Sequence, residues 1–314
     1  MRRSIVLLML ALLVVACTSG AKKQVNLESP FLGGTQGLSL DFQDFRKEVF
    51  DGGRDPFDII VKLENKGESL VAKDNVKVKI SGVNPSEFSK TEANLILAAP
   101  DDAIEMRKDP QANVLPGPPV FVEFTGLNHV PVISGATAQF PIRADVCYLY
   151  RTKTVSKLCV RENLLTPRVG GICELNEDKP VYNSGAPVQI ANFKESTRAK
   201  DKIGFTFEVT NAGGGSVYQR STFCDKAERK NEDRIFVSVD TGLSGLSCTG
   251  LDNTANGAEG FVTLYGGSKI ISCSQTISSR SDFEQIVTLE AVYDYEQTIQ
   301  TTLTVKSSGE GTTN

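Results

Sequence analysis

Six cysteines are the residues with the most evident chemistry in this chain, at positions Cys147, Cys159, Cys173, Cys224, Cys248 and Cys273. None of their spacings is Cys-x2-Cys or Cys-x4-Cys, and the single histidine, His129, is far from any cysteine pair. Zinc sites use such spacings of Cys and His. We therefore expect no metal and no cofactor, and an even number of thiols favours disulfides wherever the chain meets oxidising conditions.

A seventh cysteine, Cys17, closes the leader MRRSIVLLMLALLVVAC. Two arginines precede an apolar run from Ile5 to Ala16, which is shorter than the ~20 residues needed to span a bilayer. This order predicts a secretory signal. Its last four residues, Val14–Cys17, resemble the lipobox of prokaryotic lipoproteins. That resemblance implies lipid attachment at Cys17 and a membrane anchor; the alternative is an ordinary signal peptide whose removal takes Cys17 with it.

Composition and charge fit folded domains that do not bind nucleic acid. Of 314 residues, 40% are hydrophobic and 23% are charged, as in globular domains. Arg2 and Arg3 are lost if the leader is cleaved. The remaining chain has 32 basic residues against 38 acidic ones, a net charge of −6. We expect no nucleic-acid partner, because such proteins carry a basic stripe.

Alternating apolar and polar residues predict β-strands along most of the chain, and this period marks strands with one buried face. Sustained helical periodicity is absent after the leader, and short helices are expected only at 92–103 and 225–233. Many short strands with turns between them are typical of β-sandwiches. The expected strands lie at 38–42, 59–64, 76–80, 118–125, 136–150, 154–161, 187–193, 202–211, 234–240, 259–265, 268–277, 284–295 and 297–306.

An internal repeat divides the chain into two similar halves. Val146–Val160 and Ala291–Val305 both read Tyr-x-Tyr followed, in the same register, by Leu-x-Val. We interpret each as a hairpin with a turn in its middle. Earlier in each half, an alternating strand ends in Asn-x-Gly, at Asn65 and at Asn211, where Asn and Gly tolerate a positive φ. Two matches in the same order predict two copies of one domain.

The repeat also suggests how the cysteines pair. Cys147 and Cys159 lie on opposite arms of the first predicted hairpin, and the second copy lacks both. Opposed strand positions bring Cβ atoms within bridging range, so we predict a Cys147–Cys159 disulfide. Three connectivities are open to the other four cysteines. We favour Cys248 with Cys273, which flank a Gly-rich stretch, and Cys173 with Cys224.

These observations predict an all-β protein with two tandem sandwiches. The predicted parts are the leader and lipobox at 1–17, a tether at 18–34, domain 1 at 35–162, a linker at 163–186, domain 2 at 187–306 and a disordered tail at 307–314.

No set of catalytic residues stands out, so we expect no enzyme. His129 lies between predicted strands and is expected on a loop surface. Carboxylates gather in three predicted loops, and Ca²⁺ prefers several oxygen ligands. The alternative to a binding module is therefore a calcium-dependent binding protein, or a hydrolase, with its site between the two domains. The clustered acids are Asp55 and Asp58; Asp101, Asp102 and Glu105; and Asp225, Glu228, Glu232 and Asp233.

The loop Arg107–Pro119 is the best candidate for an interaction surface. Four of its residues are prolines, which keep a segment extended and exposed. A plain spacer remains the alternative.

The strand–Asn-x-Gly segments and the two Tyr-x-Tyr segments resemble immunoglobulin-like modules of the CARDB or cell-adhesion type, found on archaeal and bacterial surfaces. The resemblance implies a structural, adhesive or partner-binding role without catalysis. The expected location is extracytoplasmic, at the cell surface or in the periplasm, and the expected partners are the membrane, through the N-terminal lipid, and an envelope protein or glycan.

Overall fold

A computed structural model describes residues 27–165, 171–252, 257–278 and 281–309, and it is an all-β fold, as predicted. Cys17 and its leader lie outside the described residues, so the predicted signal and lipid site stay predictions. Within the described ranges, no helix is long and apolar enough to cross a membrane.

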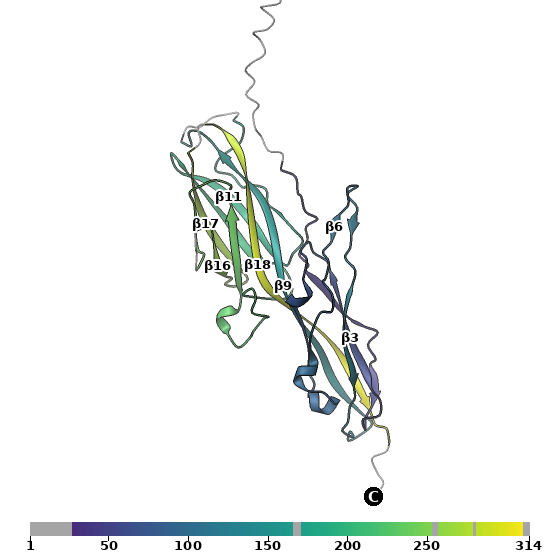
Figure 1. The fold of residues 1–314 in the computed structure, drawn as a ribbon. Helices are drawn as coiled ribbons and strands as arrows, with labels where there is room; N and C mark the ends of the chain where they lie inside the picture. The colour runs from purple at the N-terminus through teal and green to yellow at the C-terminus, as the bar shows by residue number, and fades with distance from the viewer. Residues whose placement is uncertain (1–26, 166–170, 253–256, 279–280, 310–314) are drawn as a thin grey trace, which may run out of the picture.

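Two β-sandwich modules account for most of the strands (Figure 1). Module 1 consists of the sheet β1 (Leu38–Gln43), β3 (Phe57–Asn65) and β8 (Val120–Leu127), packed on β5 (Ile96–Ala98), β4 (Val76–Ser81) and the first half of β9 (Thr137–Val160). Module 2 consists of β11 (Val188–Ala199), β12 (Lys202–Asn211), β17 (Ser268–Thr276) and β15 (Leu246–Thr249), packed on β16 (Glu259–Thr263), β14 (Arg234–Asp240) and the first half of β18 (Phe283–Lys306).

The remaining elements are short. They are β2 (Glu48–Phe50), β6 (Arg107–Lys108), β7 (Val114–Leu115), β10 (Tyr182–Asn183), β13 (Ser216–Tyr218) and the 3₁₀ turns η1 (Lys73–Asn75), η2 (Pro85–Phe88), η3 (Glu92–Leu95) and η4 (Arg229–Asn231).

The two modules have the same strand order. The order β1-β3-β8 over β5-β4-β9 in module 1 matches β11-β12-β17 over β16-β14-β18 in module 2. The Asn-x-Gly turns match as well. Asn65 Nδ2 donates to the Ser69 carbonyl at 2.7 Å, and Asn211 Nδ2 donates to the Gly215 carbonyl at 2.9 Å. In both turns the Asn side-chain oxygen accepts the N–H of the glycine two residues later.

The modules are interleaved rather than tandem. β9 and β18 are each 24 residues long and pair antiparallel over their whole length. The first half of β9 belongs to module 1, and its second half, 149–160, pairs with the first half of β18 and completes module 2. In return, residues 295–306 of β18 complete module 1. The structure thus differs from the predicted division at 163–186, because each module takes one strand from the other half of the chain.

The predicted hairpins at 146–160 and 291–305 are therefore wrong, since neither segment contains a turn. Each is the middle and end of one continuous strand (Figure 1). The two Tyr-x-Tyr segments meet at the centre, where Tyr148 pairs with Tyr295 and Tyr150 with Tyr293. All four rings are buried, and the two modules share one continuous hydrophobic core.

Candidate functional site

All six described cysteines form disulfides, as predicted, but only one predicted pairing is correct. Cys248 pairs with Cys273 on the adjacent strands β15 and β17. The predicted Cys147–Cys159 and Cys173–Cys224 pairs are wrong. The observed bonds are Cys147–Cys224 and Cys159–Cys173. Three disulfides fit an oxidising, extracytoplasmic environment.

The Cys147–Cys159 pairing fails because both residues lie on one continuous strand. Twelve residues at about 3.3 Å each separate them by roughly 40 Å, far beyond the ~7 Å limit for Cα atoms of a disulfide. Cys147 instead reaches Cys224, in the loop after β13, and joins the central strand to module 2.

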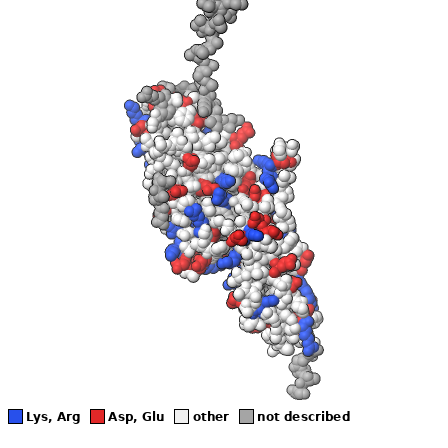
Figure 2. All heavy atoms as spheres, viewed as in Figure 1, with Lys and Arg blue, Asp and Glu red and all other residues white. Residues whose placement is uncertain are grey.

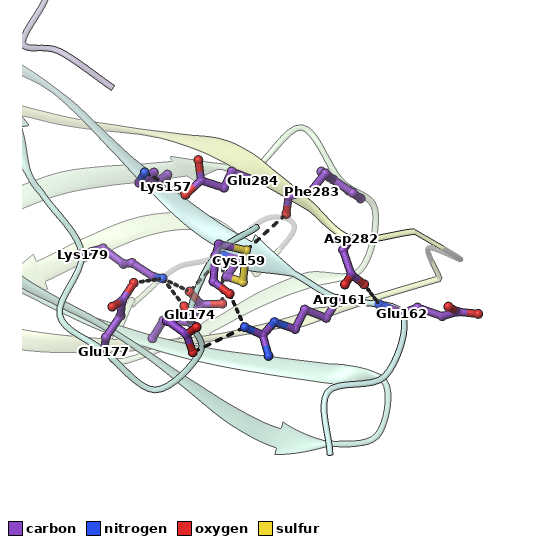
Figure 3. The surroundings of a disulfide bond; sticks show 12 residues. Lys157, Cys159, Arg161, Glu162, Glu174, Glu177, Lys179, Asp282, Phe283 and Glu284 are labelled. Carbon is purple, nitrogen blue, oxygen red and sulfur yellow. Dashed lines mark hydrogen bonds and ion pairs between the residues drawn. A yellow bond between two sulfur atoms is a disulfide. The ribbon is translucent and has the colours of Figure 1, made fainter. Parts of the chain in front are cut away.

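A buried ion pair lies beside the Cys159–Cys173 disulfide. Lys179 Nζ is 3.0 Å from a carboxylate oxygen of Glu195, and both side chains are almost completely inaccessible. Glu195 also accepts the N–H of Cys159 at 2.9 Å. Figure 3 shows the Lys179 ammonium with Glu177 close to it, at 2.7 Å. Glu195 thus connects Lys179, in the segment before β11, to Cys159 near the end of β9.

Burial raises the pKa of Glu195 to about 7, against the charge of Lys179 and the Cys159 N–H, which both lower it. A carboxyl group that titrates near neutrality is unusual. Such groups occur at active sites, but the contacts of this one, to Lys179 and to the Cys159 N–H, connect segments of the fold. We therefore assign Glu195 a structural role.

A second anchored loop lies at the centre of the molecule. Asp294 of β18 is buried and accepts the backbone N–H groups of Ser221, Thr222 and Phe223 at 2.9, 2.8 and 2.6 Å. Ser221, Phe223 and Cys224 have positive φ, which costs energy in residues other than glycine. The carboxylate and the Cys147–Cys224 disulfide together hold this loop in place.

His129 is buried, so the expected surface position is wrong. Its ring packs edge-on against Phe88 at 5.1 Å and lies 5.2 Å from Phe140. Desolvation lowers its pKa. An imidazole enclosed by aromatic rings is part of the module 1 core.

In the first predicted carboxylate cluster, both carboxylates form local bonds. Asp55 forms a two-pronged pair with Arg46, at 2.8 and 2.7 Å, and Asp58 accepts the N–H of Gly126 at 2.6 Å. Within the described ranges, no group of three or more His, Cys, Asp or Glu side chains could hold a metal ion.

The predicted interaction loop forms a small hairpin. β6 and β7 pair within Arg107–Leu115, and Figure 1 shows this arm projecting beside module 2. Val114 and Leu115 at its end are about half exposed. Lys108 Nζ donates to the Phe31 carbonyl at 3.0 Å, so the arm also contacts the N-terminal segment.

A groove of 680 Å³ lies in module 2. Its walls come from neighbouring positions of β9, β14 and β18 and from the loop after β14. Lys153, Asp240, Glu259 and Glu290 supply charges of both signs, and Phe31 supplies a ring. Sequence reasoning missed this groove, because its lining combines residues whose adjacency depends on the interleaved strands.

Charges of both signs alternate over the face seen in Figure 2. Lysine and arginine form no continuous stripe on that face. Elsewhere acidic and basic groups form partly exposed pairs such as Lys66–Glu64, at 2.6 Å.

Comparisons with known proteins leave the chain without a family. No protein-family profile and no curated protein matches it. One solved structure with a weak similarity is described as "The Triple Jelly Roll Fold and Turret Assembly in an Archaeal Virus"; it is 12% identical, with 88% of this chain and 92% of that chain covered. The TM-score of 0.12 is too low to support any inference.

Proposed function

We propose that this chain is an exported, lipid-anchored envelope protein whose two interleaved immunoglobulin-like modules act as a structural and partner-binding unit. The observation that supports it most directly is the set of three disulfides in the part of the chain that follows the leader. Thiols oxidise stably outside the cytosol, which is where the leader would deliver them.

The architecture suits an elongated protein that presents a surface to a binding partner. β9 and β18 run through both modules as one uninterrupted ladder (Figure 1), and Cys147–Cys224 adds a covalent tie across the same region. The buried carboxylates of Glu195 and Asp294 accept backbone N–H groups and so hold neighbouring segments in place. These features support binding or spacing rather than catalysis, with an envelope protein or a glycan as partner.

Metabolic labelling tests the anchor. Cells that express the full chain are fed an alkyne fatty acid, and the labelled protein is followed in membrane and soluble fractions. We expect label and membrane association for the wild type and for the neighbouring control Ser19→Ala. Cys17→Ala should lose both. Label that persists in Cys17→Ala, or wild-type protein with all six other thiols free, would refute the proposal.

A further inference from the structure

We propose that the outer edge of β18 between Thr298 and Thr302 is a strand-addition site for a short, uncharged, extended peptide of a partner protein. This proposal rests on the proposed function in that it specifies how the module would hold its partner. It depends on a comparison between the two modules.

The second halves of β9 and β18 are equivalent strands, but their outer edges differ. On β9, β10 pairs through Tyr182 with Val155 and through Asn183 with Thr154. On β18, the equivalent residues are Ile299 and Gln300. Among the described residues, the strands found on this edge are β13, at 294–296, and β2, at 304–306. Neither of them reaches residues 297–303.

The backbone groups of this segment face outward at its even-numbered residues. Thr304 donates its N–H to the Lys47 carbonyl at 2.8 Å, on the side away from β9. By the two-residue period of a strand, the N–H and C=O groups of Thr298, Gln300 and Thr302 point the same way. In module 2 the residue equivalent to Thr298 is Lys153, whose N–H and C=O are both bonded to Ser184, at 2.9 and 2.8 Å.

Within the described part of the chain no strand covers this edge, because the segment before β1 takes a different course from the segment before β11. Residues 182–187 lie along β9 on their way into module 2. The segment before β1 instead lies against the turn after β3 and the residues before β11: Leu32 donates its N–H to Glu68 at 2.8 Å, and the Gly34 carbonyl accepts the N–H of Ala186.

The bare edge lacks the usual protection against pairing. Natural edge strands are blunted by lysines, prolines or bulges, yet Gln297–Val305 reads QTIQTTLTV, without charge or proline. Its ladder with β9 has no register shift. A cavity of 340 Å³ lies at one end, between Leu38–Leu40 and Gln297–Ile299. It can receive one side chain of an added strand, as in other strand-addition sites.

A second copy of β18 does not fit this edge. Its 24 residues form one uninterrupted strand, whereas the gap between β13 and β2 spans only 297–303, about 23 Å at ~3.3 Å per residue. The occupant must leave the sheet at both ends of the gap. A short segment of a partner protein meets this condition, and the absence of charge on the edge favours a peptide without charge.

A peptide of the chain's own covering segment is a suitable probe. The sequence at 180–188, PVYNSGAPV, is uncharged and includes the residues that pair with β9 in module 2. Binding of the fluorescein-labelled peptide to the full-length protein is measured by anisotropy, and hydrogen exchange locates the protected amides. We expect saturable binding and slowed exchange at Thr298, Gln300 and Thr302.

Two variants of one residue make the test specific. Gln300→Pro removes an outward N–H but leaves the β9 ladder intact, since proline is tolerated at sheet edges, and should weaken binding at least tenfold. Gln300→Thr keeps the N–H and should bind within twofold of wild type. Absence of binding to the wild type, equal binding to Gln300→Pro, or protection elsewhere would overturn the proposal. Loss of label in Cys17→Ala is a separate outcome, so the two proposals can fail independently.

Discussion

At the scale of single residues, three disulfides and a buried ion pair join strands and loops of the described chain. Cys248 and Cys273 lie on neighbouring strands close in sequence, so local reasoning found them. The partners of Cys147 and Cys159 depend on which strands are continuous, and a single sequence does not record that. The sequence also did not indicate that Lys179 and Glu195 are buried, because Lys179 lies in a polar segment.

The raised pKa of Glu195 gives a prediction for stability against pH. The native carboxyl holds its proton up to about pH 7, whereas the unfolded one releases it near 4.5. Between these values the native state binds more protons, so this group's contribution is full below pH 4.5 and is lost as pH rises through 7. The whole effect is at most about 3 kcal/mol.

Urea unfolding of the wild type and of Glu195→Gln at pH 5 to 8 measures this contribution. The difference in unfolding free energy between the two proteins should change by about 1–3 kcal/mol over that range, in favour of Glu195→Gln as pH rises. His129 and the other titrating groups are common to both proteins and cancel. A difference independent of pH would show that Glu195 is ionised throughout.

At the scale of elements, the alternating pattern predicted where strands lie but not where they end. Residues 150–155 read YRTKTV and 295–300 read YEQTIQ. Neither contains the Gly, Pro, Asn or Asp that a tight turn requires. That missing turn signal favours a continuous strand, and giving it more weight would have replaced both predicted hairpins with the long strands observed.

The matched turns after β3 and β12 allow a paired test of buried hydrogen bonds. Asn65 is 2% exposed, and its Nδ2 donates to two carbonyls, of Ser69 and Ala103, at 2.7 and 3.0 Å. Asn211, half-buried, donates only to Gly215 in the contacts found. Asn65→Ala leaves more buried groups without partners, so it should cost about 2–4 kcal/mol and Asn211→Ala about 1 kcal/mol. Urea unfolding of the two variants would contradict this account if their costs were equal or reversed.

At the scale of the whole molecule, the sequence shows its internal repeat but not the interleaving of the strands. Each half of the sequence contains all but the last strand of one module, so the repeat is visible. The exchange of the last strand between modules leaves no trace in either half, because β9 and β18 have the same inward-facing pattern whichever module they complete. The tandem and the interleaved arrangements have the same local sequence pattern. They differ only in which strands, distant in the sequence, pair with each other.

The exchange predicts that the two modules unfold as one unit. Residues 295–306 of β18 belong to the sheet of module 1, while 283–294 of the same strand form the core of module 2. Loss of either sheet therefore removes a strand from the other. Val78→Ala in β4, a fully buried position of module 1, should cost about 2 kcal/mol and lower the Tm by about 5 °C.

Hydrogen exchange of β12 and β17 shows whether that loss reaches module 2. In the interleaved arrangement their amides lose protection together with those of module 1, and calorimetry shows one transition. Val114→Ala, at an exposed position on the β6–β7 hairpin, is the control and should change neither measurement. Tandem independent domains would instead leave module 2 at wild-type protection and produce two transitions, because no strand would connect the melting of one sheet to the other.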